Sequence, residues 1–138
     1  MNTFTLEIAT PERLAYSEEI EQVTVPSVDG QLTILPHHVP LFATLGEGEV
    51  VIRAKGEDTF LAIGGGFIEV TPTKTIVLVT RAVNADELNE EAIEKARKEA
   101  EEIIEKGAPE EAINAARSVL RSTLVDLKVA RRRKPRTV

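Results

Sequence analysis

Two adjacent histidines, His37 and His38, are among the residues of this 138-residue sequence that most suggest a chemical role. Imidazoles bind transition metals, but a metal site needs further ligands at a suitable spacing, and none accompanies this pair. Side chains of adjacent residues also point to opposite sides of an extended chain. We therefore predict that the two histidines bind no metal.

A run of three glycines, Gly64 to Gly66, follows an expected strand, which is also where phosphate-binding loops lie. No Lys-Ser or Lys-Thr pair comes after it, however, and residues 67–70 continue as a strand and not as a helix. A bulge, or a close approach of the backbone to a neighbouring strand or a partner, accounts better for the three glycines.

No residues are arranged for catalysis. The chain has no cysteine, which excludes disulfides, thiolate catalysis and metal sites with cysteine ligands. None of its serines has a convincing His or Asp partner, and most carboxylates lie where helix surfaces or strand edges are expected. We predict a protein that is not an enzyme and that carries no cofactor.

Charge is distributed unevenly along the chain. Residues 1–84 carry a net charge of −6, residues 85–111 carry −7 and residues 112–138 carry +7. The basic segment suits an acidic protein surface, and it contains Arg117, Arg121, Lys128, Arg131, Arg132 and Arg133. The overall charge of −6 and an aromatic content of 4% argue against nucleic acid as a partner. For residues 131–136, contact with anionic lipid and simple solvation remain alternatives.

The expected secondary structure changes from strands to helices near residue 84. Before it, strands are expected near residues 4–8, 20–25, 31–35, 50–53, 59–63, 67–71 and 74–80. They show alternation of apolar and polar residues and are separated by glycine or proline, at a spacing typical of an antiparallel sandwich or barrel. A helix is expected to fit only in the turn at residues 40–45.

Beyond residue 84 the sequence is helical. Asn84 with Glu87 suggests a capping box, Lys106-Gly107 ends the first helix, and Pro109 begins the second. We therefore predict an α+β protein, with an N-terminal antiparallel β-sandwich at residues 1–84 and a C-terminal antiparallel helical hairpin at residues 85–138. Residues 131–138 are predicted to be frayed.

Apolar residues recur every three or four positions along both helices. The predicted stripe consists of Leu88, Ala92, Ala96, Ala100 and Ile103, flanked by Ile93 and Ile104, and in the second helix of Ile113, Ala116, Val119 or Leu120, Thr123 or Leu124, and Leu127. Alanine buries little area, so the hairpin gains little from packing on itself. We expect an element with more than one arrangement, held by whichever partner it meets.

Three stretches of the sequence resemble the epsilon subunit family of F-type ATP synthases. Residues 30–41, GQLTILPHHVPL, match the family pattern G-x-L-G-I-x-P-x-H-x-P-L except for Thr33 in place of a glycine. Residues 63–70, IGGGFIEV, match its pattern G-G-[FI]-x-E-V, and residues 8–13 resemble its opening strand and turn. The likeness extends over essentially the whole chain, although the C-terminal half matches mainly in pattern.

The resemblance implies a rotor subunit of the central stalk, bound to the gamma subunit and seated on the ring of c subunits. Gln31 and His38 would lie at or near the c-ring contact, although His38 could equally serve only to hold its loop. Gly65 and Phe67 would contact gamma. Such a subunit takes part in coupling proton flow to ATP synthesis. It lies peripherally on the cytoplasmic face of the bacterial inner membrane, or on the stromal side of the thylakoid.

The resemblance also implies a regulatory hairpin. In an extended state its basic residues would contact the acidic lower end of the catalytic alpha/beta head and resist ATP hydrolysis. Some bacterial members bind ATP through an [IL]-D-x-x-R-A motif, but the aligned residues 88–93 here are LNEEAI. Loss of the motif's arginine removes a charge-assisted contact to phosphate, so ATP binding is disfavoured, with Asn89 and Arg97 as the remaining candidates.

Two other functions stay open on the sequence alone. One is a free-standing β-sandwich binding module with a helical tail, and the other is a nucleotide sensor that acts through the hairpin. The first residues have no basic start followed by an apolar run, so no secretory signal is expected. No window of about 18 apolar residues occurs, so membrane association is expected only through the complex.

Overall fold

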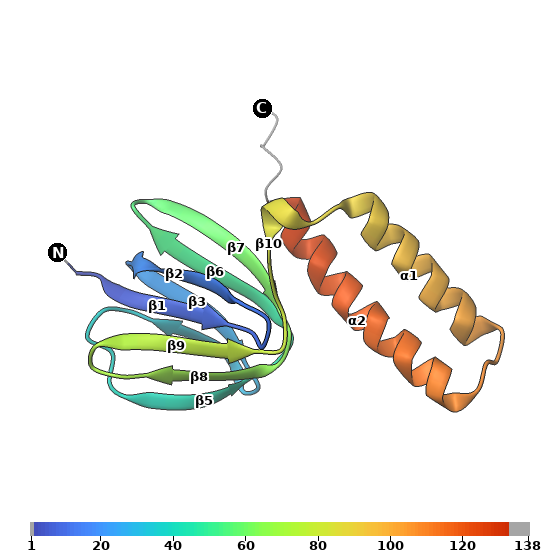
Figure 1. Ribbon diagram of the computed structural model, residues 1–138, viewed down its shortest axis with the longest axis horizontal. Coiled ribbons are helices and arrows are strands. Elements are labelled where there is room, and N and C mark those ends of the chain that lie inside the picture. Colours follow the sequence, from blue (N-terminus) through green and yellow to red (C-terminus); the bar gives the residue numbers. More distant parts are fainter. Residues whose placement is uncertain (1, 133–138) are drawn as a thin grey trace. The chain divides into compact units, whose positions relative to one another are not determined.

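The computed structural model describes residues 2–132, and the chain divides into two compact units between residues 84 and 85. The first unit consists of strands and the second of helices (Figure 1). This α+β architecture, a sandwich followed by a helical hairpin, confirms the predicted fold class.

Ten strands form one continuous hydrogen-bonded sheet within residues 2–84. They are β1 (Phe4–Ala9), β2 (Leu14–Ile20), β3 (Gln22–Ser27), β4 (Gly30–Ile34), β5 (Leu41–Leu45), β6 (Gly48–Ala54), β7 (Glu57–Ile63), β8 (Gly66–Val70), β9 (Lys74–Val79) and β10 (Ala82–Asn84). Their order is β10-β7-β6-β3-β5-β8-β9-β1-β2, with β4 paired to β3. Neighbouring strands are antiparallel as predicted, except that β1 and β9 run parallel.

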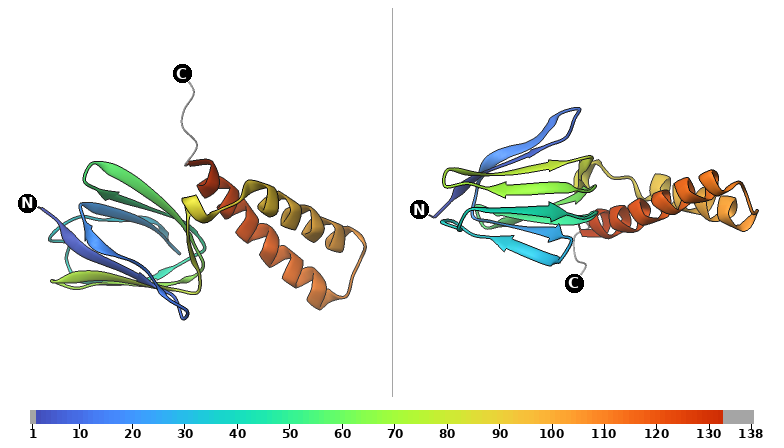
Figure 2. Two further views of the ribbon diagram at one scale, coloured as in Figure 1. Left: turned by 45° about the horizontal axis from the view of Figure 1, so that its top comes forward. Right: turned by 90° about the horizontal axis from the view of Figure 1, so that it is seen from below.

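The sheet folds over into two layers because a single residue pair, Ser27 with Leu45, joins β3 to β5. The strands on either side of this junction stack face to face (Figure 2). Alternate residues of both layers point inward and form the core, which includes Leu6, Ile8, Val23, Val25, Val50, Ile52, Leu61, Ile63, Ile68 and Val77. Full burial of such a side chain stabilises the sandwich by about 1.5–3 kcal/mol.

Residues 41–45 form strand β5, so the expected helical turn at residues 40–45 is wrong. The strand pairs with β8 along its whole length, from Leu41 opposite Val70 to Leu45 opposite Gly66. Pairing in the sheet decides the conformation of this segment, which its local sequence leaves ambiguous. The sequence analysis also did not predict strands β2 and β10. Strand β2 is a largely exposed edge strand, and β10 has only three residues, too few to show an alternating pattern.

The three glycines lie beside the end of β9. A Cβ atom at Gly66 would lie 2.7 Å from the Cα atom of Val79, and one at Gly64 would overlap the hydroxyl group of the threonine after β9. A Cβ atom at Gly65 would meet only the carbonyl oxygen of Leu45, at an ordinary distance of 3.5 Å. Close approach of a neighbouring strand therefore explains Gly64 and Gly66, and the fold does not itself require glycine at position 65.

The second unit comprises a short 3₁₀ helix, η1 (Ala85–Glu87), and the antiparallel helices α1 (Glu90–Glu105) and α2 (Glu110–Arg132) (Figure 1). Helix α1 begins later than predicted, because Asn84 is the last residue of β10. The N-cap is Asn89, whose Oδ1 accepts a hydrogen bond from the Ala92 amide at 3.1 Å. Asn84 therefore does not cap α1 and instead directly precedes η1, whereas the end at Gly107, with a φ of 66°, is as predicted.

The hairpin buries alanines together with branched apolar side chains. Its buried and half-buried apolar positions are Ile93, Ala96, Ala100 and Ile104 of α1 and Ala112, Ile113, Ala116, Leu120, Val125, Leu127, Val129 and Ala130 of α2, and Thr123 is buried among them. The stripe predicted for α1 is therefore rotated, because Ala92 and Ile103 are exposed. On α2, Val119 and Leu124 are exposed, which settles the two alternatives that the sequence left open.

Helix α2 includes Arg131 and Arg132, where fraying was predicted, so that prediction is wrong for these two residues. The rest of the predicted frayed segment, residues 133–138, lies outside the described residues. Between residues 2 and 132, no helix is both long enough and apolar enough to cross a membrane.

An ion pair within α1 favours the charged form of Glu94. The Arg97 guanidinium donates two hydrogen bonds to Glu94 Oε2, at 2.7 and 3.2 Å. These bonds lower the pKa of Glu94, partial desolvation opposes the shift, and the charges of Arg97 and Arg131 add to the lowering. A carboxylate with a lowered pKa stabilises the folded state above its unfolded-state pKa, and this stabilisation is lost as the pH falls through the folded-state pKa.

We predict that Gly66→Ala destabilises the sandwich, because its new methyl group would collide with the backbone of β9. The free energy of unfolding, measured by urea titration, should fall by about 1–3 kcal/mol. Gly46→Ala is the matched control, since nothing lies within 4 Å of a Cβ atom there. The control should change the free energy by less than about 0.5 kcal/mol. Equal losses in the two variants would contradict this account of the glycine run.

We predict that Glu94→Gln reduces the sensitivity of the helical unit to acid. Helix melting, followed by circular dichroism at 222 nm, should shift to lower temperature in the wild-type chain below about pH 4.5, the ordinary pKa of glutamate. The variant should lose less on acidification, because its amide does not titrate. Glu91→Gln, at an exposed position of the same helix, is the control and should retain the wild-type response.

Candidate docking surfaces

A row of apolar side chains crosses the outer face of the layer that contains β5, β8, β9 and β1. The register places Phe67 of β8 opposite Leu78 of β9, and Leu78 opposite Ala9 of β1. Phe42 of β5 stacks on Phe67, with ring centroids 5.2 Å apart. Phe42, Phe67 and Leu78 are 64%, 39% and 41% exposed. We call Phe42, Phe67, Leu78 and Ala9 the apolar row.

Strand alternation is what turns the apolar row outward. Ile68 and Val77, the sequence neighbours of Phe67 and Leu78, are completely buried between the two layers. With a period of two, the residues next to them must point away from the core. Outward strand residues facing water are usually polar, and a contiguous exposed apolar patch marks a contact site for another protein.

A shallow groove of about 380 Å³ lies at one end of the apolar row. Its lining brings together Gly65 and Phe67, the two residues expected to contact gamma. Pro11 and Leu78 add to its apolar walls. Because Gly65 has no side chain, its backbone is open to close approach by a partner. The surface offers packing area and no reactive group, so its chemistry is that of docking.

Sequence reasoning missed Phe42 and Leu78. The expectation of a turn at residues 40–45 hides Phe42, although Leu41, Ala43 and Leu45 alternate with it in the manner of a strand. Leu78 lies in the continuous apolar run of β9, where alternation gives no signal. Only the register of the sheet reveals that the two residues share one face with Phe67.

Gln31 and His38, the residues expected near the c-ring, are separated along β4, with Gln31 near its start and His38 beyond its end. Gln31 is the second residue of this strand, opposite Pro26, and is exposed. His38 follows the other end of β4 and is half-buried in the loop before β5. From Gln31 to the end of β4 the strand spans about 10 Å.

The imidazole of His38 is engaged within its own loop. Its Nδ1 atom lies 2.7 Å from the carbonyl oxygen of Val39, which supports the alternative that His38 holds this loop. His37 precedes it with a left-handed backbone, at a φ of 64°. Both histidines line a pocket of about 370 Å³. Among residues 2–132, no group of three or more His, Cys, Asp or Glu side chains could hold a metal ion.

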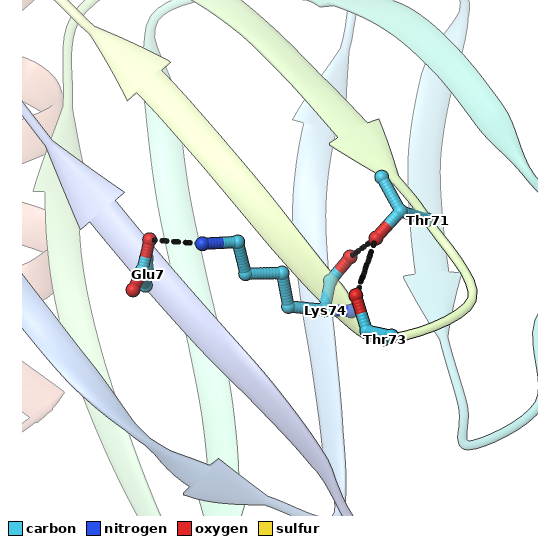
Figure 3. Close-up of polar contacts among 4 residues, drawn as sticks. All are labelled: Glu7, Thr71, Thr73 and Lys74. Atoms are coloured by element: carbon cyan, nitrogen blue, oxygen red, sulfur yellow. Dashed lines mark hydrogen bonds and ion pairs between the residues drawn. The ribbon is translucent and has the colours of Figure 1, made fainter.

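The turn between β8 and β9 forms one wall of this pocket. Figure 3 shows the polar contacts of Thr71 and Lys74 at this turn. The Thr71 hydroxyl donates to the carbonyl of Lys74 at 2.8 Å and accepts from its amide at 3.1 Å. The Lys74 ammonium reaches across to Glu7 of β1, at 3.3 Å. These polar groups therefore hold the turn and its neighbouring strand in place and are not arranged around a ligand.

Basic side chains occupy one face of α2. Arg117, Arg121, Lys128, Arg131 and Arg132 are all exposed and recur at helical spacing. Leu124, 62% exposed, lies among them, so the face combines an apolar centre with surrounding cations. The sequence analysis offered Leu124 as a residue of the apolar stripe between the two helices, so its position on this exposed basic face was not predicted. Arg133, predicted to belong to the same surface, lies outside the described residues.

The two candidates for nucleotide binding are engaged within the hairpin. Asn89 Oδ1 caps α1, and the Arg97 guanidinium is hydrogen-bonded to Glu94. A phosphate near Arg97 would also meet the negative charge of Glu94. The structure therefore does not assemble Asn89 and Arg97 into a nucleotide site.

Two solved mitochondrial ATP synthases contain chains with this fold. A chain of the Euglena gracilis enzyme, in its OSCP/F1/c-ring structure, aligns with a TM-score of 0.68 and 20% identity over 94% of this chain and 78% of that one. A chain of the Tetrahymena thermophila central stalk and c-ring aligns with a TM-score of 0.56 and 18% identity, over 92% and 96%. At these identities the likeness concerns the fold alone.

Curated relatives are closer in sequence. The ATP synthase epsilon chain of Herpetosiphon aurantiacus is 40% identical over 131 residues, which are 95% of this chain and 96% of the relative. That of Dehalococcoides mccartyi is 37% identical over 130 residues, or 94% and 93%. The family model of the ATP synthase delta/epsilon chain β-sandwich domain matches residues 3–85. As the motifs at residues 30–41 and 63–70 indicated, the chain belongs to the ATP synthase epsilon chain family.

Proposed function

We propose that this chain is a non-catalytic rotor subunit of an F-type ATP synthase. It links the gamma subunit to the ring of c subunits in the central stalk, helps to couple proton flow to ATP synthesis, and restrains ATP hydrolysis through its hairpin. The names of its relatives support this role, as does the occurrence of its fold in a central stalk and c-ring structure. Its place is peripheral, on the cytoplasmic face of a bacterial membrane or the stromal side of a thylakoid.

The observation that carries the proposal is the apolar row. Stacked aromatic rings exposed on a sheet are typical of the buried centre of a protein interface, where aromatic anchors supply most of the affinity. We assign the row and the adjoining Gly65 backbone to the gamma subunit. The rest of the sandwich keeps this surface rigid, because every strand that carries the row also contributes buried core residues.

We assign the basic face of α2 to an acidic surface of the catalytic alpha/beta head. Five exposed cations around Leu124 offer charge complementarity together with one apolar contact. Charge of this kind sets the orientation and rate of association more than its strength. No regulatory nucleotide is part of the proposal, since Asn89 and Arg97 already serve the hairpin.

The c-ring contact of the proposal includes the surface at one end of β4. Gln31 lies near the start of this strand, and His38 lies beyond its end. Gln31 is the more exposed of the two, and its amide is available at the surface, whereas His38 is already bonded within its loop. We therefore place Gln31 in the contact.

We predict that Phe67→Asp weakens binding to the matching alpha-beta-gamma complex, because it puts a charge at the centre of the apolar row. The dissociation constant, measured by calorimetry, should rise at least about 30-fold. Val39→Asp is the matched control, since Val39 is 70% exposed in the loop before β5 and lies outside the row. It should change the constant by less than about two-fold. If both variants bind like the wild type, gamma contacts another surface.

We predict that a chain ending at Asn84 binds this complex but does not inhibit it. Residues 1–84 form a compact unit with its own core, so the truncated chain retains the apolar row. Full-length protein should lower the rate of ATP hydrolysis, and the truncated chain should bind with a similar dissociation constant without lowering it. Inhibition by the truncated chain would assign the regulation to the sandwich. Failure of both chains to bind would overturn the proposed function.

A further inference from the structure

The hairpin is joined covalently at one end only. Residues 106–109 connect α1 to α2, and the start of α1 lies near the end of α2 because the two helices are antiparallel (Figure 1). Toward that open end, Ile93 of α1 and Leu127, Val129 and Ala130 of α2 are buried. Buried Thr123 bonds the carbonyl of Leu120 in its own helix and so does not bridge the two helices. Charged contacts at the open end add to these apolar ones.

Arg131, near the end of α2, lies close to two carboxylates at the start of α1. Its Nη2 atom is 3.8 Å from Glu94 Oε1, and its Nε atom is 4.0 Å from Glu90 Oε1. Glu90 and Glu94 are four residues apart and so share one side of α1. The other oxygen of Glu94 accepts from Arg97, which holds that carboxylate in position. The two carboxylates are 26% and 32% exposed, and Arg131 is 61% exposed.

The strength of these contacts suits reversible closure. Distances of 3.8 and 4.0 Å are those of ion pairs without direct hydrogen bonds. Exposed ion pairs shift an equilibrium by about two- to five-fold and weaken with added salt. Such contacts favour the closed hairpin without preventing it from opening. They also leave much of the Arg131 guanidinium accessible to another carboxylate.

We propose that Arg131 is a reversible clasp, which closes the open end of the hairpin on Glu90 and Glu94 and is released when an acidic protein surface supplies replacement carboxylates. The identity of the acidic partner rests on the proposed function, whereas the clasp itself does not. One guanidinium cannot remain beside both α1 carboxylates and also bind a partner. Engagement of the basic face and opening of the hairpin are thereby coupled.

Amide hydrogen exchange of the full-length chain tests the clasp. Arg131→Gln and Glu90→Gln should each accelerate exchange in α1 about two- to five-fold at low salt. The double variant should exchange like Arg131→Gln alone, because loss of Arg131 already removes its contact with Glu90. The acceleration should disappear in 1 M sodium chloride.

Two controls match the charge changes. Arg121→Gln removes an exposed cation that bonds Ser118 of its own helix, and Glu91→Gln removes an exposed carboxylate of α1. Both should exchange like the wild type. Unchanged exchange in Arg131→Gln, or equal acceleration in Arg121→Gln, would overturn the proposal.

A peptide of ten glutamates, added at low salt, tests release by carboxylates. It should accelerate α1 exchange in the wild type and have no further effect on Arg131→Gln. Acceleration of both chains by the same factor would show that Arg131 is not the group released. Because these measurements use the chain alone, their result is independent of the hydrolysis assay that tests the proposed function.

Discussion

The register between β8 and β9 determines where the apolar row lies on the sandwich. Gly66 allows the backbones to approach, and this register places Phe67 directly opposite Leu78. The same pairing sends Ile68 and Val77 into the core. A slip by one residue would reverse both faces, exposing core side chains and burying the row, so the core holds the docking surface in register.

In the helical unit, apolar burial and charged contacts contribute in a different proportion than in the sandwich. The buried positions of the helical unit include Ala100, Ala116 and Ala130 beside a few branched residues, and alanine contributes less on burial than the larger side chains of the sandwich core. Charges take a larger part, as at Glu94, which contacts Arg97 of its own helix and Arg131 of α2. Interactions of this kind respond to salt, acid and charged partners, whereas a packed core does not.

The sequence predicted the division at residue 84 because the hydrophobic period changes there from two to nearly four. Its motifs also identified the family, and Gly65 and Phe67 do line one groove. The exposed position of Phe42 could not be predicted from the sequence. It lies in a five-residue strand without a clear local preference, and pairing with β8 determines the conformation of that strand. The start of α1 was misplaced for a similar reason, since β-sheet pairing with β7 holds Asn84 extended and leaves the cap to Asn89.

Contacts between charged residues that are distant in the sequence could not be predicted from it either. Segment charges of −7 and +7 show that the two helices can attract each other, but not which residues meet. The structure selects Arg131, and the selection matters because this residue also belongs to the basic face. While the hairpin is closed, acidic α1 lowers the positive potential at the end of α2, which disfavours weak encounters with unrelated acidic molecules. In the proposed function, a partner that offers several carboxylates in the right places competes with the acidic helix for Arg131 where a single charge cannot.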